Sequence, residues 1–123
     1  VFRGGLVSYQ DAIKTQLLDV DPQVLQEDSA VSEAVAYQMA EQGRQLFGSD
    51  YAVSTTGIAG PTTPQSGQSV GLTYIAVAGP QGTRVARFNF SGNRQKIREV
   101  ATLNAYNELR RSLIQDGVLA LEA

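Results

Sequence analysis

The sequence predicts a layered α/β domain with a mixed sheet, and three observations lead to this fold class. Strand-like and helical segments alternate along the chain, which is typical of helices packed on a sheet. The segment "VGLTYIAVAG" at 70–79 is almost continuously apolar, as expected of a strand that is covered on both faces. The chain has 123 residues, which fits one domain over residues 1–123.

The first third of the chain predicts a strand and two helices. Residues 2–8 have the apolar character of a short strand, and residues 10–19 follow with helical periodicity. The "SYQD" sequence, Ser8 to Asp11, resembles a loose capping box at the start of this helix. Pro22 suits the first turn of a second, short helix. The apolar positions of the first helix are Ala12, Ile13, Leu17 and Leu18.

A longer helix is predicted over residues 27–48, and Gly48 is suited to end it. Its apolar stripe comprises Val31, Ala34, Val35, Met39, Gln42 or Gly43, and Leu46. The longest helix is predicted from Asn93 to about Asp116, where Gly117 ends it. Its buried stripe comprises Ile97, Ala101, Ala105, Leu109 and Leu113.

The remaining strands are predicted at residues 51–57 and in a hairpin at 70–90. The "GPQG" sequence at 79–82 forms the hairpin turn, because Pro80 presets the backbone for it. An antiparallel hairpin beside the other predicted strands makes the sheet mixed instead of wholly parallel. The polar stretch "GPTTPQSGQS" at 60–69 is expected to be a flexible loop.

Composition excludes several functional classes. The net charge of −2 gives no electrostatic reason to expect nucleic acid or an anionic membrane as a partner. No apolar run approaches the roughly 18 residues that span a bilayer, and no signal peptide is recognisable, so we expect a cytoplasmic protein. The chain has no Cys and no His, which excludes Ser-His-Asp and Cys-His catalysis and His-ligated metal sites within it.

The loop "STTGIAGPTT", Ser54 to Thr63, is the first candidate for ligand binding. It follows a predicted strand and contains two glycines and five hydroxyl side chains. Backbone N–H groups near Gly57 and Gly60 could hold an anion, with hydroxyl groups as further donors. It matches neither the P-loop nor the dinucleotide fingerprint, and a solvated connection is the alternative.

Arg94 and Arg98 lie one turn apart at the start of the last predicted helix. A cation at a helix N-terminus opposes the helix dipole, and an anionic ligand nearby would offset this cost. On spacing alone, a pair of solvated arginines is the favoured interpretation.

Lys14, one of only two lysines, lies near the start of the first predicted helix. The helix dipole and burial both disfavour the ammonium form, and either would lower the pKa of Lys14 toward the range of a general base. Tyr9 would be about 140° away on a helix, so the two side chains share a site only if Tyr9 precedes the helix. A solvated Lys14 is the alternative.

Four segments in order, "VFRGGLVSYQDAIKTQLL", "STTGIAGP", "VGLTYIAVAG" and "FSGNRQKIREVA", resemble the C-terminal domain of CinA, the competence/damage-inducible protein family. The resemblance implies a three-layer α/β/α fold with a mixed sheet. It also implies nicotinamide-nucleotide amidohydrolase activity, which converts nicotinamide mononucleotide (NMN) to nicotinate mononucleotide and ammonia. The family uses a Ser–Lys pair and needs no metal or redox cofactor.

By this resemblance, Lys14, Tyr9 and Arg94 match catalytic-site residues of the family. The substrate-binding loop matches Thr56, Gly57, Ile58, Ala59, Gly60 and Pro61. The expected partner is the small-molecule substrate NMN, with neither nucleic acid nor membrane, and a homo-oligomer, most simply a dimer, is expected.

The sequence departs from the family pattern in two places. The family's nucleophilic serine lies in an "E-S-x-T-G-G" motif upstream of the segment that matches Val1, and this chain has no such motif. We therefore expect the domain to be incomplete at its N-terminus and the 123-residue chain alone to be inactive. Thr63 and Pro64 also replace two glycines that follow the family's loop. The alternatives are a nucleotide- or phosphate-binding module without catalysis and a structural partner domain of a larger CinA-type protein.

Overall fold

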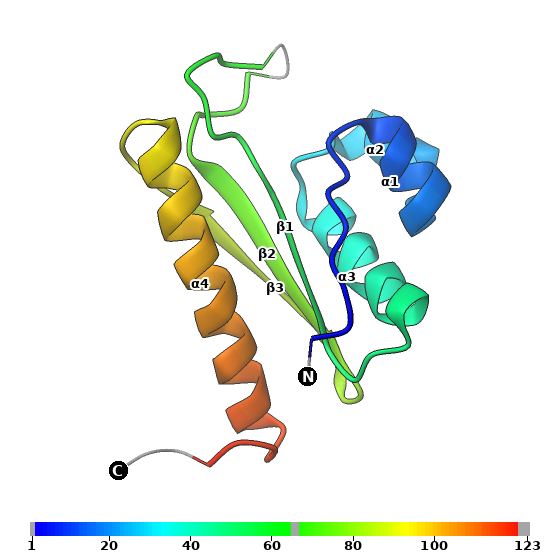
Figure 1. Cartoon of the computed structure of the whole chain (residues 1–123). Helices are drawn as coiled ribbons and strands as arrows, with labels where there is room; N and C mark the ends of the chain where they lie inside the picture. The colour runs from blue at the N-terminus through cyan, green and yellow to red at the C-terminus, as the bar shows by residue number, and fades with distance from the viewer. Residues whose placement is uncertain (1, 65–66, 121–123) are drawn as a thin grey trace.

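Helices cover both faces of a three-stranded sheet, as Figure 1 shows. The computed structural model describes residues 2–64 and 67–120. The strands are β1 (Ala52–Gly57), β2 (Leu72–Gly79) and β3 (Gly82–Asn89), in the order β1-β2-β3. Helix α3 packs on one face and α4 on the other, so the prediction of a three-layer α/β/α fold is confirmed.

The sheet differs from the prediction because every described strand pair is antiparallel. Strand β1 pairs with β2, and β2 pairs with β3 through the tight turn at Gly79 and Gly82. A parallel pair needs a long crossover, usually a helix, whereas the described residues between β1 and β2, 58–64 and 67–71, contain no helix. The hairpin prediction is therefore confirmed, and the prediction of a mixed sheet is wrong for the described strands.

The predicted strand at 2–8 is also absent, because the structure assigns neither helix nor strand to residues 2–9. A strand needs a neighbouring backbone to satisfy its N–H and C=O groups, and no described strand pairs with this segment. The segment instead runs beside α3 (Figure 1). A Cβ atom added to Gly4 would lie 2.6 Å from the ring of Phe47, so the backbone passes close to the end of α3.

The two short helices are α1 (Asp11–Leu18) and α2 (Pro22–Asp28). Both were predicted, and Pro22 lies in the first turn of α2 as expected. The capping box was wrong: α1 begins after Gln10, two residues beyond Ser8, and no side chain caps it. The N-terminal cap of α2 is Asp21, whose carboxylate accepts a hydrogen bond from the backbone of Gln23 at 2.9 Å.

Helix α3 (Glu33–Phe47) starts later than predicted, because α2 occupies the preceding residues and Ser32 caps α3 by accepting from the backbone of Val35. Gly48 ends the helix in the left-handed conformation, as predicted. Leu46 was wrongly placed in the buried stripe, since it is 54% exposed. The buried residues of α3 are Val35, Ala36, Ala40 and Gly43.

Helix α4 (Arg94–Gln115) agrees with its predicted range, with Asn93 as its N-terminal cap and Gly117 just beyond its end. Ile97 is buried against the sheet, whereas the rest of the predicted stripe is only partly buried. Over residues 2–64 and 67–120, no helix is both long and apolar enough to cross a membrane.

Candidate functional site

Lys14 lies in the middle of α1 and is the one charged residue that is buried in the described part of the chain, with 6% of its surface exposed. Its ammonium group donates a hydrogen bond to the backbone carbonyl of Ser8 at 2.5 Å. Burial lowers the pKa of Lys14, and the negative charge of Asp11 opposes this shift in part. The neutral amine of Lys14 therefore forms at a lower pH than that of a solvated lysine.

The backbone of Lys14 is held in place by the end of α1. Its carbonyl accepts hydrogen bonds from the N–H groups of Asp19, which has a left-handed conformation, and Val20. Val20 and Leu18 are buried against Val35 of α3, which anchors this end of α1 to the helix layer. The Lys14 side chain thus projects from a short helix that is fixed at its C-terminal end.

The loop after β1 is fixed at its start. The Thr56 hydroxyl is buried and donates to the carbonyl of Ala30, in the connection between α2 and α3, at 2.7 Å. Ile58 is buried, and its N–H and C=O groups bond to Leu72 and Gly71 at 2.9 and 2.7 Å. The end of β1 is therefore tied both to the helix layer and to the start of β2.

The two glycines of this loop have different reasons for lacking a side chain. At Gly57, a Cβ atom would come within 2.7 Å of the hydroxyl oxygen of Thr73. Gly60 has a φ of +77°, which L-residues rarely adopt, and a Cβ there would lie 2.6 Å from Val70. Both positions therefore need glycine for the loop to keep this path.

Arg94 is the first residue of α4, and its side chain is exposed. It donates a hydrogen bond through Nη1 to the carbonyl of Gly60 at 2.8 Å. The structure therefore brings together two of the predicted site elements, Arg94 at the start of α4 and the glycine loop after β1. Arg98, one turn further along α4, is also exposed.

The other predicted residues are not linked to the loop by any hydrogen bond or ion pair among the described residues. Lys14 bonds to Ser8, and the side chain of Tyr9 is 83% exposed. Figure 1 nevertheless places α1, the loop after β1 and the start of α4 at the same end of the sheet. Of these regions, the loop after β1 is bonded at Thr56 to the connection between α2 and α3.

One residue of this region was missed by sequence reasoning. Gln68 lies in the stretch that was expected to be a flexible polar loop. Its side chain instead donates to the carbonyl of Val31 at 2.8 Å and accepts from the hydroxyl of Ser29 at 3.0 Å. No local pattern marks a glutamine for such a contact, because its partners lie 37 and 39 residues earlier in the chain.

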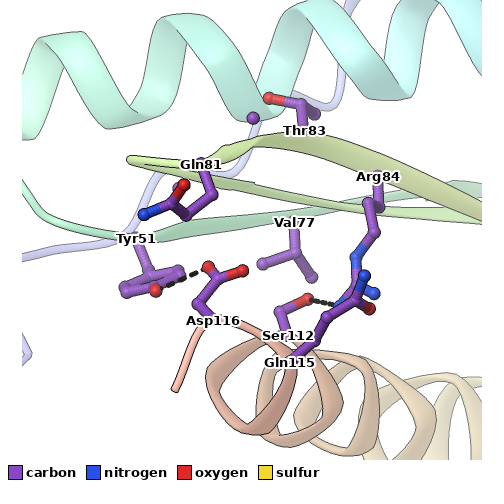
Figure 2. A pocket seen from close by; sticks show the side chains of 10 residues that line it. Tyr51, Val77, Gln81, Thr83, Arg84, Ser112, Gln115 and Asp116 are labelled. Carbon is purple, nitrogen blue, oxygen red and sulfur yellow. Dashed lines mark hydrogen bonds between the residues drawn. The ribbon is translucent and has the colours of Figure 1, made fainter. Parts of the chain in front are cut away.

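An open pocket of about 500 Å³ lies at the opposite end of the sheet (Figure 2). Tyr51 donates to the carboxylate of Asp116 at 2.7 Å, which raises the pKa of Tyr51, and Arg84 donates to Ser112 at 2.6 Å. The pocket lies at the C-terminal end of α4, whereas Arg94 begins this helix, roughly 33 Å away. None of the predicted site residues lines it, and four of its polar side chains are paired within it, Tyr51 with Asp116 and Arg84 with Ser112.

These observations define an α/β domain with a helix-covered sheet, a buried lysine and a glycine loop tied to an arginine. The family model described as "CinA C-terminal domain" matches residues 1–113, and the chain therefore belongs to this family. A CinA-like protein of Geotalea uraniireducens is 43% identical over 113 residues, and one of Thermosynechococcus vestitus is 46% identical over 116 residues. Each match covers 92% of this chain but only 27% and 28% of the respective relative.

Solved structures agree with the family assignment. The crystal structure of a CinA superfamily protein from Enterobacter cloacae has a TM-score of 0.86 and 32% identity, and the match covers 89% of this chain and 64% of that one. A CinA superfamily protein from Escherichia coli has a TM-score of 0.85 and 29% identity, with 87% and 62% coverage. The chain thus spans less than two thirds of these structures and about a quarter of the curated relatives.

Proposed function

We propose that this domain hydrolyses the carboxamide of nicotinamide mononucleotide, with Lys14 as the general base of a Ser–Lys pair. The observation that carries the proposal is the burial of Lys14, which lowers the pKa of its amine in a chain that has no histidine to serve as base. Membership of the CinA C-terminal domain family supports the same assignment.

The contact between Lys14 and Ser8 is compatible with this role. A neutral lysine amine has two N–H groups and one lone pair. Donation of one N–H group to the Ser8 carbonyl fixes the amine and leaves the lone pair to accept a proton. The Ser8 carbonyl carries no net charge and orients the amine. A carboxylate partner would instead favour the ammonium form and raise the pKa of the lysine.

The reaction requires a serine nucleophile, which we propose is supplied by a segment that precedes Val1 in the longer protein. Lys14 accepts the proton of the serine as its oxygen attacks the carboxamide carbon, and returns a proton to the departing ammonia. Water then hydrolyses the acyl-enzyme to release nicotinate mononucleotide. Neither step needs a redox partner, and every proton is passed between serine, Lys14, ammonia and water.

The glycine loop is proposed to bind the substrate through backbone N–H groups. The N–H group of Ile58 is already bonded to Leu72, and Pro61 has none. Ala59 and Gly60 lie between these two residues, and we propose that their N–H groups contact the substrate. Arg94 fixes this short segment through the carbonyl of Gly60, so its role is to position the loop and to leave guanidinium donors for an anionic group.

The test measures ammonia release and nicotinate mononucleotide formation from NMN by two chains, residues 1–123 and a longer chain that includes the upstream serine. We expect no turnover above background from the short chain and turnover from the longer one, which serine-to-alanine substitution abolishes. NMN binding without ammonia release by the longer chain would instead indicate a binding module. The absence of both NMN binding and turnover would indicate a structural partner domain.

Robust turnover by residues 1–123 would contradict the proposed mechanism, since it would require a nucleophile within them. Ser54, Thr55 and Thr56 would be the first candidates. The hydroxyls of Ser54 and Thr56 are buried and donate to backbone carbonyls, whereas Thr55 is exposed. A Thr55→Ala variant would therefore be the first to examine.

A further inference from the structure

Helix α4 presents large apolar side chains on the face that points away from the sheet. Leu103 and Tyr106 are 68% and 70% exposed, whereas Ile97 on the opposite side of the helix is buried. Glu99 and Arg110 are exposed as well, and at 100° per residue all four lie within about 60° of one another around the helix. These four residues, Glu99, Leu103, Tyr106 and Arg110, are called the outward face of α4.

The outward face has a symmetric arrangement along the helix. Glu99 lies four residues before Leu103, and Arg110 lies four residues after Tyr106. A twofold axis through the midpoint of Leu103 and Tyr106 would therefore place Leu103 of one copy against the partner's Tyr106. The same axis would place Glu99 against the partner's Arg110, twice in the pair.

The charges of the outward face are not used in ion pairs within the described part of the chain. Glu99 accepts only from the amide of Gln95 at 3.2 Å, and Arg110 donates only to Asn107, at 3.0 and 3.2 Å. The ion pair that the structure describes on α4 joins Arg111 and Glu108, which lie off this face. Glu99 and Arg110 are therefore available for charges on another molecule.

Because the outward face of α4 points away from the sheet, a molecule that packs on it must lie outside the layer of helices that covers the sheet. Figure 1 shows α4 as the outermost element on its side of the sheet. A further helix packed beside α4 on the same sheet would cover the flanks of α4, because helices in one layer lie side by side. The outward face would stay exposed, and two exposed apolar side chains between charges of opposite sign suit an interface.

We propose that the outward face of α4 is a self-association surface, on which the α4 helices of two copies of this chain pack antiparallel about a twofold axis. The interface has an apolar centre of Leu103 and Tyr106 and two Glu99–Arg110 pairs that fix direction and register. One helix face is smaller than a standard interface, so the dissociation constant is expected to be on the order of 10⁻⁴ M. The proposal does not depend on the amidohydrolase activity.

The test is a charge exchange, followed by sedimentation velocity over a concentration series of the 123-residue chain. Glu99→Arg places arginine against arginine, and Arg110→Glu places glutamate against glutamate. Each single change is expected to raise the dimer dissociation constant at least about tenfold. The double variant, and a mixture of the two single variants, restore both opposite-charge pairs and should return to within about threefold of the parent.

Arg98→Glu is the matched control, because it makes the same charge change as Arg110→Glu on an exposed position about 100° away from Glu99. It should leave the dissociation constant unchanged within about twofold. Recovery in the mixture separates the proposed interface from misfolding, since each single variant must then be folded. A chain that stays monomeric to about 1 mM, or a dimer that neither single change weakens, would overturn the proposal.

Discussion

Lys14 and Arg94 are held in the same way but differ in what they can do chemically. Each donates to a backbone carbonyl, Lys14 to Ser8 and Arg94 to Gly60. Lys14 is buried and Arg94 is exposed. Burial removes hydration from the ammonium group and lowers the pKa of Lys14. Burial thus suits Lys14 to proton transfer, whereas the exposed Arg94 has a positioning role.

The helices that carry Lys14 and Arg94 also differ in length and capping. Helix α1 has eight residues and no side-chain cap at its start, so Lys14 is fixed mainly by packing at the other end of the helix. Helix α4 has 22 residues and begins with a side-chain cap from Asn93. Arg94 opposes the dipole of α4, and its hydrogen bond to Gly60 offsets part of that cost.

The largest expected effect comes from Lys14→Met in a chain that includes the proposed upstream serine. Methionine retains an unbranched side chain of similar length but cannot accept a proton, so kcat/KM should fall about 10²- to 10⁴-fold. The activity of the parent should rise with pH through the lowered pKa of Lys14, because the neutral amine is the base. Steady-state kinetics over a pH series measure both effects.

Lys96→Met is the matched control, because Lys96 is the only other lysine and is exposed in the first turn of α4. It should retain kcat/KM within about twofold. If Lys14→Met kept the activity of the parent, Lys14 would be a structural residue and the proposed base would be wrong.

A smaller effect is expected for Arg94→Lys. Lysine has one nitrogen where arginine has a planar fork, so it cannot both hold the Gly60 carbonyl and offer paired donors to an anion. We expect kcat/KM for NMN to fall about tenfold or more, or about 1.4 kcal/mol in transition-state stabilisation. Arg98→Lys, one turn away on α4, is the control and should change little. Equal kinetics for the two variants would remove Arg94 from the site.

The parts of the fold that depend on local sequence were predictable. The β2–β3 hairpin follows from the turn residues Gly79, Pro80 and Gly82, and the ends of α4 follow from Asn93 and Gly117. These residues act on the backbone within a few positions, so a local pattern is sufficient to identify them.

The errors arose where the structure depends on distant partners. Residues 2–8 have the composition of a strand, but strand formation depends on a neighbouring backbone that no described strand supplies. The site shows the same limit. The resemblance to CinA domains identified Arg94 and the loop, but their direct contact spans 34 residues and has no sequence pattern. The exposure of Tyr9 likewise depends on the path of residues 2–9, which composition did not predict.

Titration of Lys14 itself tests most directly whether this residue can act as a base. Because the chain has two lysines, labelling of lysine side chains with ¹³C and ¹⁵N gives two sets of NMR signals, which Lys96→Met assigns. Asp11→Asn should lower the pKa of Lys14 further, because the charge of Asp11 raises it. Asp19→Asn, at the other end of α1, removes the same charge and is the control.

We predict that Lys14 titrates below the ordinary lysine pKa of 10.5 because of its burial. Between the lowered pKa and 10.5, the unfolded chain binds more protons than the folded one, so the free energy of unfolding should rise with pH across that window. A Lys14 signal that titrates at or above 10.5 would rule out Lys14 as the base, since the lysine would then lack the lowered pKa on which this role depends.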